Sequence, residues 1–163
     1  MCARDLKDSS GQQDLTEKPE FQSSRSLSFP ELCCRSLLEH SPQLVPPALA
    51  GSTKVNKSLS AEIVKICDEV VVICGLLTKR IEYQAIMEGK IIPNHIVHDE
   101  VPFTCLLDRE DIRSSDQFRI SELGIICEIL GDEANFASDQ TTGERIAFRY
   151  VEKDVIKVCI EKI

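Results

Sequence analysis

The sequence predicts an all-β protein, an antiparallel β-sandwich of about seven strands that follows a flexible N-terminal arm. From position 54 onward the chain is dense in Val and Ile, which form runs separated by short turns, and no long segment has helical periodicity. Before that position the chain is rich in Ser and Gln and holds five of the seven prolines. We therefore divide it into a polar, mostly disordered arm at 1–53 and a β domain at 54–163.

One stretch of the arm carries the signals of a short helix. Ser28 is a suitable N-cap, Pro30 suits the first turn, and Glu31 stands at the capping-box position. Isolated helices this short are marginal in water, so the helix needs a partner surface or else forms only transiently in a disordered tail. In the first case it presents a docking patch next to two adjacent cysteines: Leu32, Leu37 and Leu38 beside Cys33 and Cys34.

In the β domain, alternation of apolar and polar residues defines the strands. Ile81, Tyr83 and Ala85 alternate with polar residues, which is typical of a half-buried strand. Gly75 predicts a bulge or bend, and a switch of face near Glu122 predicts a second bulge. A turn is expected at 88–89, and acidic loops are expected at 108–116 and 131–143. The predicted strands cover 61–66, 69–86, 90–97, 99–107, 117–130, 144–150 and 154–161.

Composition and charge argue against several classes of partner. The net charge of −8 disfavours nucleic acid and anionic membranes. Aromatic residues are only 5% and tryptophan is absent, so a stacking platform for polysaccharide is a weak hypothesis. No apolar run is long enough to span a membrane, and the polar N-terminus lacks the apolar region of a signal peptide. We expect synthesis in the cytoplasm, where thiols stay reduced until the protein meets an oxidising environment.

The sequence gives no support for catalysis or metal binding. No Cys-x-x-Cys occurs, and His95 and His98 are three residues apart, so on a strand their side chains point to opposite faces. The carboxylates at 108–111 and 132–139 lack the spacing of a calcium loop. We therefore predict a protein without catalytic residues, cofactor or metal.

The eight cysteines are the most unusual feature of the composition. By strand parity Cys105 and Cys127 share faces with apolar neighbours and are expected to be buried, whereas Cys67 and Cys159 share faces with charged neighbours and are expected to be exposed. Two adjacent cysteines cannot readily pair with each other. Either all eight stay reduced, or Cys67 pairs with Cys159 within the chain, or disulfides link subunits. The candidates for intersubunit disulfides are Cys33, Cys34, Cys67 and Cys159.

Four blocks of the β domain resemble the SPOCS domain of spore-forming Firmicutes. They are VVVICGLLTKRIEY at 70–83, VHDEVPFTCLLD at 97–108, EANF at 133–136 and EKDVIKVC at 152–159. They occur in the same order as in the family, and the resemblance covers about residues 54–162. Larger family members carry several such domains with a LysM module, whereas this sequence shows one domain and no peptidoglycan-binding module. The resemblance implies protein–protein binding in spore-coat and cortex morphogenesis, and no catalytic residues.

The function predicted from these features is that of a spore-associated structural protein. It would assemble with itself into a polymer or filament through the β domain and the arm, stabilised by intersubunit disulfides, in the spore coat or on the spore surface. An N-terminal arm with two cysteines ahead of an all-β domain is also the arrangement of endospore appendage pilins, an analogy of design only. The alternative is a non-polymerising adaptor that binds a scaffold protein of the coat or cortex.

Overall fold

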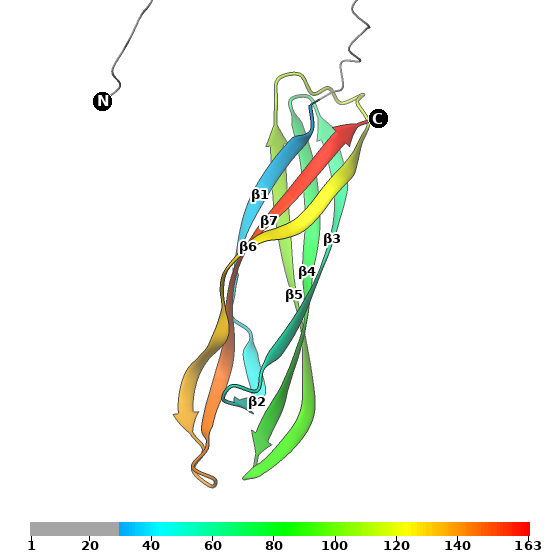
Figure 1. The fold of residues 1–163 in the computed structure, drawn as a ribbon. Helices are drawn as coiled ribbons and strands as arrows, with labels where there is room; N and C mark the ends of the chain where they lie inside the picture. The colour runs from blue at the N-terminus through cyan, green and yellow to red at the C-terminus, as the bar shows by residue number, and fades with distance from the viewer. Residues whose placement is uncertain (1–29) are drawn as a thin grey trace, which may run out of the picture.

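The computed structural model describes residues 30–163, which form seven β-strands, with no helix in this part of the chain (Figure 1). All strand pairs are antiparallel, so the predicted all-β class is confirmed. The strands are β1 (Leu32–His40), β2 (Gln43–Leu49), β3 (Lys54–Cys67), β4 (Val70–Met87), β5 (Lys90–Asp108), β6 (Phe118–Ser138) and β7 (Arg145–Lys162).

Backbone hydrogen bonds join the seven strands in one sheet. Its order is β1-β7-β2-β4-β3, with β5 on the free side of β4 and β6 on the free side of β7. A sandwich would have two separate sheets, whereas here β2 pairs with both β4 and β7 and connects them. Above β2 in Figure 1, the β1-β7-β6 ladder and the β3-β4-β5 ladder face each other.

The apolar core lies between these facing ladders in two clusters. The upper cluster includes Ile73 and Leu77 of β4 and Ile156 and Val158 of β7, all fully buried. The lower cluster surrounds β2 and consists of Leu44, Ala48, Ile81, Tyr83, Ala85 and Tyr150. In β4, buried and less buried positions alternate over most of the strand, and the alternation expected for Ile81, Tyr83 and Ala85 is present.

The segment predicted to be a helix of the arm is strand β1. It pairs with β7 over nine consecutive residues, from Leu32 opposite Ile160 to His40 opposite Glu152. Residues 32–49 therefore belong to the sheet, and the boundary expected after residue 53 falls in the turn between β2 and β3. Tertiary pairing overrides the local helix signals, because the ladder with β7 satisfies the backbone groups along one edge of β1 and the strand buries Leu32, Cys34 and Leu38 in the core. The predicted cap Ser28 and positions 1–29 of the arm predicted at 1–53 lie outside the described residues.

Other expectations on the elements had mixed outcomes. The turn at 88–89 is present, with positive φ at Glu88 (52°) and Gly89 (71°). The register shifts at the expected bulge, between Ile120 and Glu122. Gly75, by contrast, pairs regularly with both of its neighbouring strands and forms no bulge. β5 and β7 are single long strands where two shorter ones were expected, and β6 continues through most of the predicted acidic loop to Ser138.

Candidate functional site

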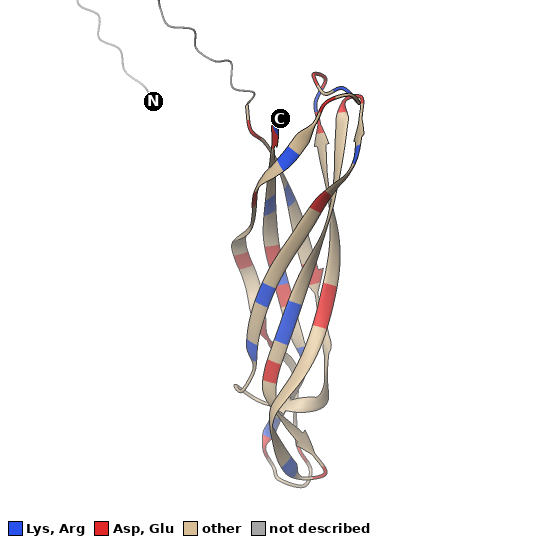
Figure 2. Ribbon diagram, turned by 90° about the vertical axis from the view of Figure 1, so that its right-hand side faces the viewer, with Lys and Arg blue, Asp and Glu red and all other residues tan. Residues whose placement is uncertain are grey.

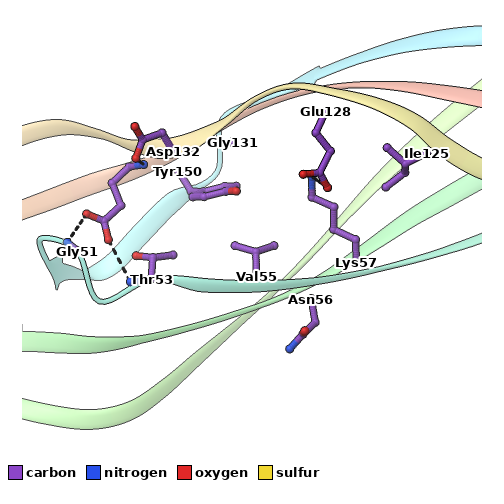
Figure 3. A pocket seen from close by; sticks show the side chains of 11 residues that line it. Gly51, Thr53, Val55, Asn56, Lys57, Ile125, Glu128, Gly131, Asp132 and Tyr150 are labelled. Atoms are coloured by element: carbon purple, nitrogen blue, oxygen red, sulfur yellow. Dashed lines mark hydrogen bonds and ion pairs between the residues drawn. The ribbon is translucent and has the colours of Figure 1, made fainter.

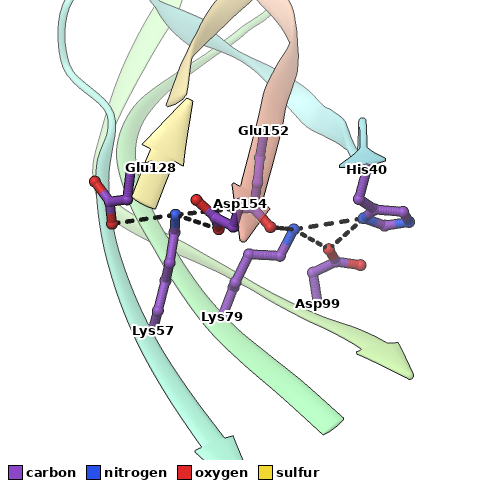
Figure 4. A network of polar contacts seen from close by, with 7 residues as sticks. All are labelled: His40, Lys57, Lys79, Asp99, Glu128, Glu152 and Asp154. Carbon is purple, nitrogen blue, oxygen red and sulfur yellow. Dashed lines mark hydrogen bonds and ion pairs between the residues drawn. The ribbon is translucent and has the colours of Figure 1, made fainter. Parts of the chain in front are cut away.

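A network of buried charges crosses the interior between the two core clusters (Figure 4). At its centre is Lys79 of β4, whose side chain is completely buried. Its ammonium lies 2.7 Å from Asp99 of β5 and 3.1 Å from Glu152 of β7. Burial of an unpaired ammonium would be very unfavourable, so these two carboxylates are what allow the lysine to be charged there.

Lys57 of β3 is the second cation of the network. It donates a hydrogen bond to Asp154 at 2.7 Å and lies 3.5 Å from Glu152 and 3.4 Å from Glu128. Burial lowers the pKa of Lys57, but the hydrogen bond to Asp154 and the surrounding negative charges raise it more, so the net shift of this pKa is upward. At the other end of the network, His40 lies 2.8 Å from Asp99.

The network is negatively charged overall. Two lysines face four carboxylates (Asp99, Glu128, Glu152 and Asp154), so its sum is 2 − 4 = −2 with His40 neutral. Glu152 lies at ion-pair distance from both ammonium groups without making a hydrogen bond, and Asp154 Oδ1 is buried without a hydrogen-bond partner. The network reaches the surface at Glu128, whose side chain is 65% exposed.

Beside Glu128 lies a cleft of about 630 Å³ between β3 and β6 (Figure 3). At one end the Glu133 carboxylate accepts hydrogen bonds from the backbone N–H groups of Gly51 (2.7 Å) and Thr53 (3.1 Å), which fixes the β2–β3 turn to β6. At the other end stands the Lys57–Glu128 pair. The cleft is lined by Gly51, Thr53, Val55, Asn56, Lys57, Ile125, Glu128, Gly131, Asp132, Glu133 and Tyr150.

The chemistry of the cleft favours cations. Glu128, Asp132 and Glu133 against Lys57 give the lining a charge of 1 − 3 = −2. The ring of Tyr150 adds an aromatic surface, and burial raises the pKa of its phenol, so it stays neutral. Carboxylates beside an aromatic ring form the kind of surface that accepts ammonium and guanidinium groups.

The cysteines predicted to link subunits are paired within the chain instead. Cys33 of β1 is bonded to Cys159 of β7, with an S–S distance of 2.02 Å, and Cys34 of β1 is bonded to Cys105 of β5, at 2.10 Å. Adjacent residues of a strand point to opposite faces, so Cys33 and Cys34 reach different partners. The prediction of intersubunit disulfides is wrong for Cys33, Cys34 and Cys159, and the intrachain alternative of Cys67 with Cys159 is also wrong.

Strand parity placed the remaining cysteines only in part. Cys105 is buried as predicted, but Cys127 is exposed and Cys159 is fully buried. Bulges in β6 on either side of Cys127 turn it outward. Cys159 does lie on the outer face, as its parity indicates, but β1 and β6 flank it there, and their side chains cover it. Cys67 is free and half-buried.

The predicted docking patch is wrong for two of its three leucines. Leu32 and Leu38 are buried in the upper core cluster, and only Leu37 is exposed. Leu37 belongs to a different surface, which we call the outer patch, on the outer face of the β1-β7-β6 ladder. Its members are Leu37, Ile126, Cys127, Ile129, Leu130 and Val155. The signal for it in the sequence is the run IICEIL at 125–130, which is too apolar for a strand with only one buried face.

The two strand histidines lie apart, as the sequence predicted. His95 is half-buried, with its Nε2 3.2 Å from the carbonyl oxygen of Val45 and its ring edge-on to Tyr83 at 5.2 Å. His98 is exposed.

No protein-family model, curated protein or solved structure matches this chain. The resemblance to the SPOCS domain therefore stays a prediction, supported by the four sequence blocks alone. Residues 30–163 contain no helix that could cross a membrane. On the face seen in Figure 2, acidic and basic residues are interspersed along the strands instead of being gathered into a stripe of one sign.

Proposed function

We propose that this chain is a non-enzymatic structural protein that assembles with copies of itself, and that it does so in the spore coat or on the spore surface, as its resemblance to the SPOCS domain implies. The observation that supports self-assembly is the outer patch. It places exposed apolar side chains side by side on a rigid sheet, away from the core. Contiguous apolar surface of this kind is typical of protein–protein contacts.

The register of the strands makes the outer patch continuous. Leu37 of β1 and Cys127 of β6 both stand opposite Val155 of β7, so the three form one row across the ladder. At the next bulge along β6, Ile129 and Leu130 extend the outer patch, and they are 52% and 46% exposed. These side chains gain free energy when a partner removes them from water.

The borders of the outer patch suit a second copy of the same chain. Lys153 pairs with Glu39 at one end, and Lys157 lies 2.7 Å from Glu122 at the other. Each end thus carries an ion pair, and Arg35, which stands opposite Lys157, adds a second positive group at that end. A copy related by a two-fold rotation can therefore place groups of opposite sign against each other at the borders of the interface.

Cys127 supplies a thiol for covalent linkage within this interface. It is exposed and lies in the middle of the outer patch, so two copies packed face to face bring two such thiols close together. Dioxygen or another oxidant would take up two electrons and two protons and leave one S–S bond between the copies. This residue replaces Cys33, Cys34 and Cys159 as the candidate for an intersubunit disulfide.

The test is the molar mass of the purified chain, measured by light scattering on a sizing column and compared with gels run without reductant. We expect dimers or larger species at micromolar concentration, and a covalent fraction that reductant removes. Leu130→Glu should return the chain to monomer, and Cys127→Ser should abolish only the covalent fraction.

Matched controls are Leu106→Glu, which changes a 60% exposed leucine of β5, and Cys67→Ser, which changes another free cysteine. A wild-type chain that stays monomeric at all concentrations, or an effect of Leu106→Glu equal to that of Leu130→Glu, would contradict the proposal.

The cleft between β3 and β6 favours the second candidate, an adaptor that does not polymerise. Its negative lining suits a Lys or Arg side chain of a scaffold protein. A monomeric wild-type chain whose amide resonances shift only around the cleft on addition of N-acetyl-arginine amide would support the adaptor over the self-assembling protein.

A further inference from the structure

One of the two disulfides lies next to two carboxylates on the outer face of the sheet. Along a single row, Cys33 of β1 stands opposite Cys159 of β7, and Cys159 stands opposite Glu122 of β6. Glu31 precedes Cys33 by two residues and joins the same group. One ligand atom each of Glu31, Cys33 and Cys159 lie within 4.8 Å of one another, and Glu122 Oε2 is 3.5 Å from Cys159 Sγ.

While the sulfurs are bonded, the two carboxylates take their hydrogen bonds from other residues. A disulfide sulfur carries no hydrogen, so it cannot donate to Glu122 or Glu31. Residues of β6 and β7 fix the position of both carboxylates. Ser121 donates a hydrogen bond to Glu31 at 2.7 Å, and Lys157 donates one to Glu122 at 2.7 Å.

Reduction of the disulfide changes the balance of charge. Two thiolates and two carboxylates in this space would carry −4, against the ammonium of Lys157 and the guanidinium of Arg35, which stands opposite Lys157 on the same face. Such a group is stable only if the thiols stay protonated or if a cation enters.

We propose that Cys33, Cys159, Glu31 and Glu122 form a redox-gated site for Zn²⁺, closed as a disulfide when oxidised and binding the metal when reduced. Glu31, Cys33 and Cys159 already lie within reach of one another, and the Glu122 carboxylate, 3.5 Å from Cys159 Sγ, would turn toward them to complete the four ligands of a tetrahedral Zn²⁺ site. Zn–S bonds of about 2.3 Å hold two sulfurs roughly 3.8 Å apart. The Cα atoms of Cys33 and Cys159 are 4.0 Å apart, so rotation of the two side chains is enough to reach that spacing.

The chemical steps balance without further groups. A dithiol reductant gives two electrons and two protons to the S–S bond, becomes a disulfide itself, and leaves two thiols at positions 33 and 159. Zn²⁺ then displaces the two thiol protons and forms two Zn–S bonds, with no change of oxidation state. Oxidation of the thiolates by a disulfide reverses the sequence, re-forms the S–S bond and expels Zn²⁺.

The other disulfide provides an internal comparison. Cys34 and Cys105 are 8% and 2% exposed, and both belong to the apolar upper core cluster. Among residues 30–163, the His, Cys, Asp and Glu side chains close enough together to hold a metal ion are Glu31, Cys33 and Cys159, and neither Cys34 nor Cys105 belongs to that group. The proposal therefore separates the two cysteine pairs: only the outer pair binds metal after reduction. It does not depend on the proposed self-assembly.

The experiment uses the full chain with the four remaining cysteines replaced by serine (Cys2, Cys67, Cys74 and Cys127), kept reduced with a phosphine and titrated with Co²⁺ without oxygen. We expect one equivalent to bind, with thiolate-to-cobalt charge-transfer absorption and the visible bands of a tetrahedral site, and Zn²⁺ should displace it. Cys159→Ser should remove the charge-transfer band, and Cys105→Ser should leave it unchanged. Glu122→Gln should weaken binding about tenfold or more.

A second measurement avoids variants that fail to fold. Zn²⁺ added to the reduced wild-type chain should protect Cys33 and Cys159 from alkylation by iodoacetamide, as read by mass spectrometry of peptides, and the oxidised chain should bind no Zn²⁺. Absence of the charge-transfer band, its persistence in Cys159→Ser, failure of Zn²⁺ to protect the outer pair, or equal protection of Cys34 and Cys105 would each overturn the proposal.

Discussion

Lys79 shows how a single residue can depend on the whole sheet. It lies at an inward position of β4, between Leu77 of the upper core cluster and Ile81 of the lower one. A hydrophobic residue would fit the alternation, yet the position holds a charge whose partners come from β5 and β7. Such a buried ion pair is weak evidence for stability in itself, but removal of one member leaves the others buried and uncompensated.

We therefore predict that Lys79→Met, which keeps the length of the side chain and removes its charge, lowers the free energy of unfolding by about 3–5 kcal/mol. The cause is repulsion and poor solvation of Asp99 and Glu152, which lose their nearest cation. Urea denaturation followed by circular dichroism measures the effect.

The matched control for Lys79→Met is Arg80→Ala on the same strand. Arg80 pairs with Glu82 at 2.9 Å, but both side chains are partly exposed, at 42% and 33%. We expect a loss below about 1 kcal/mol for it. Equal losses of unfolding free energy for the two substitutions would show that the buried ion pairs of Lys79 contribute no more to stability than the exposed pair of Arg80.

At the scale of the elements, β-bulges decide which sequence predictions held. Alternation of apolar and polar residues predicted most of β4 and the turn that follows it, because the extra residue at each register shift along β4 belongs to β3 or β5, so β4 keeps its own parity. In β6 the register shifts three times, and each shift reverses the parity beyond it. The face of Cys127 could not be predicted, because the alternation of apolar and polar residues does not show how many bulges precede it in β6.

The prediction of a helix where the structure has strand β1 was wrong for a different reason. Burial along β1 alternates, with Leu32, Cys34 and Leu38 inward, so period two was present in the sequence. The local signals of Ser28 and Pro30, by contrast, favour a helix. Pairing with β7 determines that this segment is a strand, because β7 pairs with all nine residues of β1. β7 lies more than a hundred residues later in the sequence. The ion network and the cysteine pairs could not be predicted for the same reason, because their members come from strands that are far apart in the sequence.

Gly75 allows a test of close packing between two elements. It stands opposite Phe103 on the neighbouring strand, and a Cβ at position 75 would lie only 2.1 Å from the ring of that phenylalanine. We predict that Gly75→Ala destabilises the protein by about 1–3 kcal/mol, because the ring must leave its place in the upper core cluster. Thermal unfolding measures the loss.

Gly124→Ala is the matched control for Gly75→Ala, since Gly124 also lies within a strand and a Cβ there would have no atom within 4 Å. It should change the midpoint little or raise it, because alanine restricts the unfolded chain. A loss equal to that of Gly75→Ala would indicate that glycine serves a backbone purpose at both sites instead of making room for the ring.

At the scale of the whole molecule, the two disulfides connect different pairs of strands. Cys33–Cys159 joins β1 to β7, which nine residue pairs already connect. Cys34–Cys105 joins β1 to β5, two strands that are not paired with each other in the sheet and meet only through side chains and a bond from Ser36 to the Thr104 carbonyl. The second disulfide therefore holds one ladder against the other along this side.

This difference predicts where the structure opens when each disulfide is removed. The bonded cysteines are 126 positions apart in Cys33–Cys159 and 71 positions apart in Cys34–Cys105, so loss of either disulfide should cost about 4–5 kcal/mol through the entropy of the unfolded chain. The native state should respond unequally. In Cys34→Ala/Cys105→Ala, amide hydrogen exchange should speed up along the edge of β5 near Thr104, because little else ties that edge to β1.

In Cys33→Ala/Cys159→Ala the backbone hydrogen bonds between β1 and β7 remain, so exchange in both strands should rise only through global unfolding. Comparison at equal global stability, set by a small amount of urea for the more stable variant, isolates the local effect by mass spectrometry. If β5 exchanges at the same rate in both variants, side-chain packing alone holds β5 against β1. The covalent link between the ladders would then matter only in the unfolded chain.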